Sequence, residues 1–438
     1  MRRTWLSVVL LGAILAGCGG GDDSGGSGSG GEDLAGTKLT WWATNQGGSI
    51  DRDNAVLKES VARFKEQSGI EVDFRVIPWP DLFNQITTAV TSGKGPDVLN
   101  IGNTWSASLQ ATGAFEPFEG DTLDAVGGGD KFLATALKAT GAPGQPPTSV
   151  PLYGLSYVLF YNKQAFKEAG IAKPPATWSE FVADAKKLTK EGQWGVALEG
   201  AQVSTNSHAA FIFGRQNGGD LFDGNTPTFT SDGVVKGVSD FVGLMARDKV
   251  VNPSNAQYGD GTQAIADFAK GKAAMLMWQV NAETTIKDAG MKPSEYGVAK
   301  MPVADGSSTP TMTMVAGTNV SVFKNTEHKD AALEFVKFLT SPDEQVKLNS
   351  AYQSLPVVSA AAEDKAFSDP TKTVANEILA ENAEPMPLIP EEGQMETLIG
   401  TAMKNLFAQA ATKGAVSDAD IKAALDDANK KMAAASGG

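Results

Sequence analysis

Aromatic and amide side chains gather just beyond several expected β-strands. The aromatic residues at or past strand ends are Trp42, Trp79, Trp105, Tyr153 and Trp278. The neighbouring amide residues are Asn45, Gln46, Asn103, Asn206, Asn217 and Asn319. Aromatic rings offer flat apolar faces, and amides both donate and accept hydrogen bonds. The combination suits a solute with C–H faces and many hydroxyl groups, such as a sugar, although a single tryptophan more often packs in a core.

The strands that carry these residues alternate with helices along the first half of the chain. β-prone or alternating runs predict strands at Leu39–Trp42, Val72–Val76 and Val98–Ile101, each followed by apolar residues at helical spacing. The order β-α-β-α-β-α favours a parallel sheet with helices on both faces. Because ligands of such sheets bind beyond the carboxyl ends of the strands, the aromatic and amide residues would meet at one edge.

The pattern changes near Tyr153, where a second series of elements begins. Thr177 and Glu180 form a capping box that opens a helix. Further strands are expected at Trp194–Leu198, Ala273–Trp278 and Val315–Phe323. Roughly 400 residues exceed the size at which a single core stops growing, so we predict two α/β domains.

The inventory of catalytic residues is poor. Only two histidines occur, His208 and His328, and the chain has no Gly-x-Ser-x-Gly elbow, P-loop or metal-spaced Cys/His set. We therefore expect no metal and no cofactor, and a binding protein rather than an enzyme, with His208 in a structural or ligand-contacting role. Because 51 acidic residues are present, a carboxylate pair of the kind that glycosidases use remains an alternative.

The net charge of −14 restricts the partners. Nucleic acid and anionic lipid headgroups both require a basic footprint, and the sequence contains no basic cluster. We expect a monomer without a nucleic-acid partner.

The N-terminus has the pattern of an export signal. Two arginines precede an apolar run from Trp5 to Ala16, which ends in Leu-Ala-Gly before Cys18, the only cysteine. This resembles the bacterial lipobox, in which the thiol is acylated and becomes the new N-terminus; a plain secretory signal with a chance cysteine is the alternative. Residues 19–33 are all Gly, Ser, Asp or Glu, which predicts a disordered tether. We expect an extracytoplasmic protein whose membrane contact is the lipid anchor alone.

Eight short motifs follow one another along the rest of the chain. They are Leu39–Ala43, Gly95–Val98, Gly113–Pro117, Val150–Gly154, Phe160–Lys163, Pro175–Phe181, Phe268–Met275 and Phe335–Pro342. Each is modest alone, but in this order and spacing they closely resemble the family 1 extracellular solute-binding proteins, the maltose-binding-protein-like receptors of ABC importers.

This resemblance implies a bilobal α/β fold of the periplasmic-binding-protein type, with two lobes joined by crossing hinge strands. On that pattern, residues 1–17 are a lipoprotein signal peptide and residues 18–36 are the lipidated Cys18 with its linker. Lobe 1 comprises residues 37–153 plus 316–356, and lobe 2 comprises residues 154–315 plus 357–438. A solute bound in the cleft would favour a closed form that the permease subunits of an ABC importer recognise.

The resemblance also implies particular ligand-binding residues. The matching positions are Asn45 and Gln46 in the first ligand loop, Asn103 and Trp105 after the third strand, Tyr153 at the first crossing, Trp278 as a stacking tryptophan, and Gly317 with Asn319 at the second crossing. Leu155 stands where trehalose/maltose receptors carry a carboxylate, and Asn103 lies in a loop where an acid is common. A maltose-type ligand is therefore disfavoured, unless Glu392 restores an acid from the loop before the final helices.

We therefore predict a receptor that captures a sugar or oligosaccharide for an ABC importer. The alternative is a receptor for a non-sugar solute, namely glycerol phosphate, a polyamine or an iron complex. A phosphate would require basic residues in the cleft, and Arg52, Arg75 and Arg215 are the only arginines expected near it. A charged amine would require more acids than the sequence alone locates there.

Overall fold

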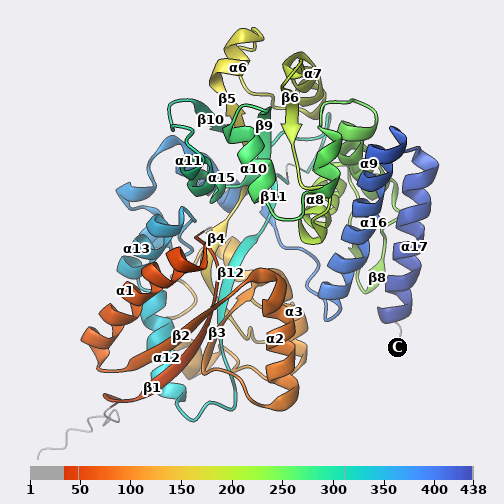
Figure 1. Ribbon diagram of the computed structural model, residues 1–438. Helices are drawn as coiled ribbons and strands as arrows, with labels where there is room; N and C mark the ends of the chain where they lie inside the picture. Colours follow the sequence, from red (N-terminus) through yellow and green to blue (C-terminus); the bar gives the residue numbers. More distant parts are fainter. Residues whose placement is uncertain (1–33, 48, 310, 437–438) are drawn as a thin grey trace, which may run out of the picture. The chain divides into compact units, whose positions relative to one another are not determined.

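The computed structural model describes residues 34–438 except 48, 310, 437 and 438. The predicted signal peptide, Cys18 and nearly all of the linker lie outside the described residues. From Leu34 onward the chain forms one compact unit, and its longer strands make two separate sheets (Figure 1).

The first sheet has five strands, and distant parts of the sequence contribute to it. In spatial order they are β2 (Glu71–Ile77), β1 (Lys38–Thr44), β3 (Val98–Gly102), β12 (Ala316–Val322) and β4 (Val150–Leu155). β1 pairs in parallel with β2 and β3, as the alternating pattern predicts. β12 pairs antiparallel with both β3 and β4, so a strand late in the sequence closes this sheet. Apolar cores lie against it, one of them centred on Trp41 and Phe335.

The second sheet has four strands. They are β10 (Tyr296–Ala299), β5 (Tyr157–Asn162), β9 (Ala273–Gln279) and β6 (Trp194–Ala197). β6 and β9 are parallel, while β5 is antiparallel to β9. Consequently the start of β5 lies at the same edge as the ends of β6 and β9. Two-stranded pairs complete the β-structure: β7 (Phe222–Asp223) with β8 (Thr226–Pro227), and β11 (Thr313–Met314) with β13 (Ala383–Glu384).

Helices cover both sheets. Up to residue 188 they are α1 (Ile50–Ser68), α2 (Trp79–Ser92), η1 (Asn103–Trp105), α3 (Ser106–Ala111), α4 (Gly120–Ala125), α5 (Ala134–Leu137), α6 (Lys163–Glu168) and α7 (Trp178–Leu188). The middle of the chain adds α8 (Val203–Gln216), α9 (Asp232–Ala246), η2 (Pro253–Gln257), α10 (Thr262–Ala269) and α11 (Ala282–Asp288). The last part adds α12 (Lys329–Leu339), α13 (Pro342–Tyr352), α14 (Ser359–Ala362), η3 (Lys365–Phe367), α15 (Pro370–Glu381), α16 (Glu392–Lys413) and α17 (Asp418–Ser436).

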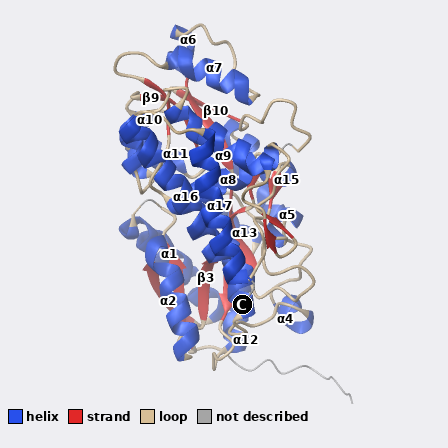
Figure 2. Cartoon of the chain, turned by 90° about the vertical axis from the view of Figure 1, so that its right-hand side faces the viewer, coloured by secondary structure: helices blue, strands red, loops and turns tan. Residues whose placement is uncertain are grey.

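Helix ends follow the local sequence. The predicted capping box at Thr177 and Glu180 is present at the start of α7, and the Ser341 hydroxyl caps α13. The helices of the C-terminal part are interrupted after α15, because residues 385–391 form an irregular segment between β13 and α16. α16 packs beside α8 and α17 (Figure 2). Among the described residues, no helix combines the length and apolarity that a membrane span requires.

The chain crosses between the sheets where β4 ends and β5 begins, with Ser156 between them. A second crossing leads into β12, whose Ala316 pairs with Leu155. The lobe limits remain predictions. Beyond the predicted end of lobe 1 at residue 356, Val357, Val358 and Ala361 still pack in the core of the first sheet. The helical segment α14 therefore belongs with that sheet, because its apolar residues face that core.

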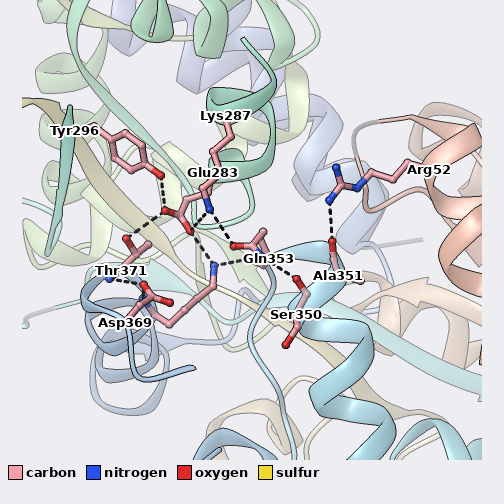
Figure 3. Close-up of polar contacts among 10 residues, drawn as sticks. Arg52, Glu283, Lys287, Tyr296, Ser350, Ala351, Gln353, Asp369 and Thr371 are labelled. Carbon is pink, nitrogen blue, oxygen red and sulfur yellow. Dashed lines mark hydrogen bonds and ion pairs between the residues drawn. The ribbon is translucent and has the colours of Figure 1, made fainter. Parts of the chain in front are cut away.

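Polar contacts join helices of the two sheets beside these crossings (Figure 3). Arg52 of α1 donates to the backbone oxygen of Ala351 in α13 at 3.1 Å, and its guanidinium lies 3.9 Å from the Asp288 carboxylate of α11. The Lys372 ammonium of α15 lies 3.2 Å from Glu283 of α11 and donates to the backbone oxygen of Gln353 at 3.0 Å. These contacts fix the ends of α13 and α11 relative to each other.

Candidate functional site

The carboxyl ends of β1, β2 and β3 present several of the predicted binding residues at one edge of the first sheet. Asn45 accepts a hydrogen bond from the indole N–H of Trp79 through its backbone oxygen, at 2.9 Å. Trp79 in turn meets the Trp105 ring edge-on, with centroids 5.6 Å apart. Phe83 packs against the same ring at 5.1 Å. The result is an aromatic cluster of Trp79, Phe83 and Trp105, each of them partly exposed.

The second sheet presents a matching set at the edge where β5 starts and β6 and β9 end. Tyr157 opens β5 opposite Gln279, and Trp278 lies next to the end of β9. Glu199 follows β6 closely and accepts a hydrogen bond from Thr205 at 2.9 Å. Gly261 lies so close to Trp278 that a Cβ there would be 2.4 Å from the indole, and 3.2 Å from Glu199 Oε1. Glu199 and the Trp278 ring are therefore neighbours.

Helices α8 and α16 add further polar groups at this edge. The Tyr157 hydroxyl is 2.9 Å from His208 Nδ1, and His208 Nε2 is 3.6 Å from the Glu396 carboxylate. Glu396 and Glu392 lie one helical turn apart on α16, and their carboxyl groups interact. Asn206, one turn from Gln202 at the start of α8, is fully buried and donates to the backbone oxygen of Gly200 at 3.0 Å.

Contacts at α16 bring the two edges together. The Glu392 carboxyl lies near the Thr104 hydroxyl of η1. At the next residue, a Cβ on Gly393 would lie 3.5 Å from the Phe83 ring. Asn103 donates from Nδ2 to the backbone oxygen of Val315 at 2.5 Å, beside the second crossing. The aromatic cluster of the first sheet and the acidic residues of the second therefore form one continuous surface.

Several polar atoms of this surface are buried without a hydrogen-bond partner. They are Glu199 Oε1, both carboxylate oxygens of Glu392, Glu396 Oε1 and Asn206 Oδ1. The Thr104 hydroxyl and the Glu396 carboxyl affect the Glu392 carboxyl electrostatically, but neither forms a hydrogen bond of regular geometry with it. Leaving a buried polar atom unpaired costs about 1–3 kcal/mol, and more when it is charged. A surface of this kind is suited to a solute that supplies the missing partners.

Burial sets the ionisation of these carboxyl groups. Desolvation raises the pKa of Glu199 to about 8, although the Thr205 hydroxyl opposes the shift. Desolvation and the neighbouring Glu396 raise the pKa of Glu392 well above its ordinary value. Burial, with the charges of Glu199 and Glu396, also raises the pKa of Tyr157. Perturbed groups concentrated in one place are typical of functional sites. In the described part of the chain, no cluster of three or more His, Cys, Asp or Glu residues is arranged to hold a metal ion.

Four predicted binding residues have structural contacts instead. Tyr153 is buried in the first core, edge-on to Tyr352 with centroids 5.5 Å apart. The Asn319 amide donates to Ser106, Ala139 and Ser149 inside the first sheet and its helices. Asn217 caps the C-terminal end of α8, away from His208. Gly317 permits the close pairing of β12 with β4. The structure does not bring these four to the acidic surface, because each is already committed to packing or capping.

Gln46 has structural contacts, but it lies next to a residue of the candidate site. Its side chain donates to the hydroxyls of Thr44 and Thr318, and its backbone N–H donates to Asp53 Oδ1 at 3.1 Å. It therefore fixes the loop that carries Asn45, and it is buried.

Sequence reasoning missed Tyr157, Glu199 and Glu396. Glu199 follows an expected strand directly, which is the same signal that selected Trp105, so the strand-end rule could have found it. Glu396 is one helical turn after Glu392, and this spacing could have indicated a shared face. Tyr157 starts its strand, and only the antiparallel pairing with β9 puts it at the ligand edge.

Two sheets, each covered by helices and joined by crossing strands, form a bilobal α/β fold. Residues 47–346 match the family described as bacterial extracellular solute-binding protein. The chain belongs to this family, and the predicted fold class is confirmed.

Named relatives and solved structures agree with this assignment. The sn-glycerol-3-phosphate-binding periplasmic protein UgpB of Brucella abortus is 27% identical over 374 residues, covering 77% of this chain and 78% of that protein. An ABC transporter solute-binding protein of Thermotoga lettingae, bound with α-D-tagatose, superposes with a TM-score of 0.78 at 21% identity, covering 90% of this chain and 100% of that one. Maltose-bound MalE3 of T. maritima gives a TM-score of 0.77 at 23% identity, covering 90% and 99%.

Proposed function

We propose that this protein is a lipid-anchored extracytoplasmic receptor that captures a sugar or oligosaccharide between its two lobes and delivers it to an ABC importer. The family supports the receptor role and an extracytoplasmic location. Structural relatives bound with tagatose and maltose support a carbohydrate ligand.

The observation that carries the proposal is the meeting of aromatic rings with unpartnered polar atoms. Trp105 and Trp278 offer ring faces from opposite sheets, while Glu199, Glu392 and Asn206 have buried oxygens without donors. Sugar hydroxyls donate to such oxygens, and the C–H faces of a sugar ring pack on indoles. A solute that fills this surface would satisfy atoms that the chain leaves unpaired.

Titration of intrinsic tryptophan fluorescence tests the proposal. The chain from Leu34 onward, which forms a compact unit, is titrated with monosaccharides and oligosaccharides. A saturable signal is expected, and Trp278→Ala should weaken binding by about 10–100-fold, equivalent to roughly 1.4–2.7 kcal/mol. Trp194→Phe is the control, because Trp194 lies at the opposite end of β6. Saturable binding of another solute class, with no response to any carbohydrate, contradicts the sugar assignment.

A phosphorylated solute is the second candidate, and the named relatives include glycerol-3-phosphate-binding proteins. The three arginines considered from the sequence are engaged elsewhere. Arg215 binds Asp220 and Glu384, Arg75 lies over the Trp42 ring, and Arg52 contacts α13. A phosphate among Glu199, Glu392 and Glu396 would meet carboxyl groups that form no ion pair with a Lys or Arg of the described chain, so we favour a solute without an anionic group.

The membrane anchor is proposed from the sequence alone. Cell fractionation should find the wild-type chain with the membrane and Cys18→Ala in the soluble fraction; co-sedimentation of both with the membrane contradicts a lipid anchor at Cys18. We also propose a monomer without catalytic activity. Release of reducing sugar that a single Glu→Gln substitution abolishes would instead indicate a glycosidase.

A further inference from the structure

Elsewhere in the described chain, five of the six buried acidic residues are paired with a cationic side chain. The pairs are Glu116 with Lys329, Asp184 with Lys187, Asp240 with Lys236, Glu283 with Lys372 and Glu344 with Arg63. The sixth, Asp53, accepts the backbone N–H groups of Gln46 and Gly47 through Oδ1, while its Oδ2 has no hydrogen-bond partner. Such compensation is expected, because an unpaired charge in the interior is strongly destabilising.

The three glutamates at the proposed ligand surface depart from this pattern. Glu199, Glu392 and Glu396 are 3%, 0% and 8% exposed. Among the described residues, no Lys or Arg forms an ion pair with any of them, and the nearest basic group is His208, at 3.6 Å from Glu396. Four of their six carboxylate oxygens are buried without a hydrogen-bond partner. The start of α16 supplies only a partial positive charge to Glu392.

The three carboxyl groups are linked through Glu396 and Tyr157. Glu392 and Glu396 interact directly across one turn of α16. Glu396 and Glu199 are both close enough to Tyr157 to affect the ionisation of its hydroxyl. Asp260, which is exposed, adds further negative charge near Glu199. Burial favours the protonated forms of Glu199 and Glu392 in the ligand-free protein, and a bound cation would favour their carboxylates instead.

We infer that the solute carries a protonated amine, which binds among Glu199, Glu392 and Glu396 in place of the cation that the protein omits there. The inference rests on the proposed function and narrows it, so that the ligand is an amino sugar or a short oligosaccharide of amino sugars. The aromatic residues agree with such a ligand. Tyr157, Trp278 and Trp105 can pack on the sugar ring, and an ammonium over an aromatic face gains about 0.5–2 kcal/mol.

The structure thus reverses one argument made from the sequence. The sequence alone disfavours a charged amine as the ligand, because it places too few acidic residues at the site. Tertiary packing places Glu392 and Glu396 of α16 on one side of Tyr157 and His208, and Glu199 after β6 also lies close enough to Tyr157 to affect it.

Isothermal titration with matched sugars tests the inference. The chain from Leu34 onward is titrated at pH 7 with glucosamine, glucose and N-acetylglucosamine, and with the glucosamine β-1,4-disaccharide, cellobiose and N,N′-diacetylchitobiose. Each set differs only in whether the substituent is an amine, a hydroxyl or a neutral amide. We expect the amine to bind at least about tenfold more tightly than both neutral partners. Spermidine and CaCl₂ are included as a non-sugar amine and an inorganic cation.

Three outcomes separate the two proposals. A neutral sugar that binds as tightly as its amine overturns the inference and leaves the sugar receptor intact. Binding of spermidine without binding of any sugar supports the charge and overturns the sugar assignment. Binding of no amine in the panel, or stabilisation by CaCl₂ alone, overturns the inference.

Substitutions of the two α16 glutamates test whether these residues cause the preference for the amine. Glu392→Gln and Glu396→Gln should each reduce amine affinity at least about tenfold while affecting the neutral sugars far less, so the preference for the amine collapses. Glu116→Gln is the control, because this buried acid has its own lysine and lies beside the end of β12, in the first sheet's half of the molecule. The ligand-free melting temperature should not fall in Glu392→Gln, since glutamine is uncharged and has nearly the shape of the buried carboxyl group that it replaces. An unchanged preference for the amine in both α16 variants overturns the inference even if an amine binds.

Discussion

The Lys372 ammonium lies 3.2 Å from the Glu283 carboxylate, and the two side chains are only 3% and 6% exposed. This pair joins α15 to α11, and the same ammonium donates to the backbone oxygen of Gln353 at the end of α13. Glu283 also accepts from the Tyr296 hydroxyl at 2.6 Å, so its remaining hydrogen-bonding capacity is satisfied (Figure 3). Glu199 and Glu392 are buried as well, but neither forms an ion pair of this kind in the described chain.

Removing the cation of this pair should destabilise the fold. Lys372→Met leaves Glu283 buried without a counter-charge and Gln353 without its donor, and such losses cost about 3–5 kcal/mol. Urea denaturation followed by circular dichroism measures the loss. Lys430→Met is the control, because the Lys430–Asp426 pair lies on the exposed face of α17 and should contribute little. Equal stability of the two variants would contradict a structural role for the buried pair.

Asp53 should make stability depend on pH. Burial raises the pKa of Asp53 from 3.8 to about 6, although the N–H groups of Gln46 and Gly47 oppose the shift. The folded protein therefore binds the proton more tightly than the unfolded chain, and the stabilising contribution present below pH 4 is lost as the pH rises through 6. Asp53→Asn removes this dependence. Its stability relative to wild type should increase between pH 4 and pH 7, by at most about 2–3 kcal/mol. A difference that is flat across this range contradicts the assignment.

Binding of an amine should release protons through Glu199. With a pKa of about 8, Glu199 is mainly protonated in the ligand-free protein at pH 7. A nearby cation favours the carboxylate and lowers this pKa, so up to about one proton leaves when the amine binds. Calorimetric titrations in buffers of different ionisation enthalpy measure the number released. Glu199→Gln should reduce it, whereas uptake of protons by the wild type at pH 7 would have the wrong sign.

Gly317 should be required for stability at the second crossing. Its φ is +154°, and a Cβ would lie 2.1 Å from the backbone oxygen of Tyr153, which cannot move without disturbing the β4–β12 pairing. Gly317→Ala should therefore cost about 2 kcal/mol or more in unfolding experiments. Gly306→Ala is matched for positive φ but has no neighbour within 4 Å of the added atom. If both variants lose the same stability, the close contact has no special role.

Much of the local structure could be predicted from the sequence. The capping box at Thr177 identified helix α7 and the strand runs identified strands such as β3, because caps and periodicity act within a few residues. The family resemblance and the α/β alternation gave the bilobal fold class. The strand-end rule also selected Trp79 and Trp105, which the structure places in contact.

Only the tertiary structure decided which predicted residues share a surface. Asn319 and Asn217 have the same chemistry as Asn206, but one is enclosed in the first sheet and one caps a distant helix end. The sequence determined where strands end and which side chains follow them, because these are local properties. Whether His208 meets Glu396 depends on how α8 and α16 pack, which is set by apolar contacts between segments almost two hundred residues apart. For that reason the acidic residues of the site could be identified only from the folded structure.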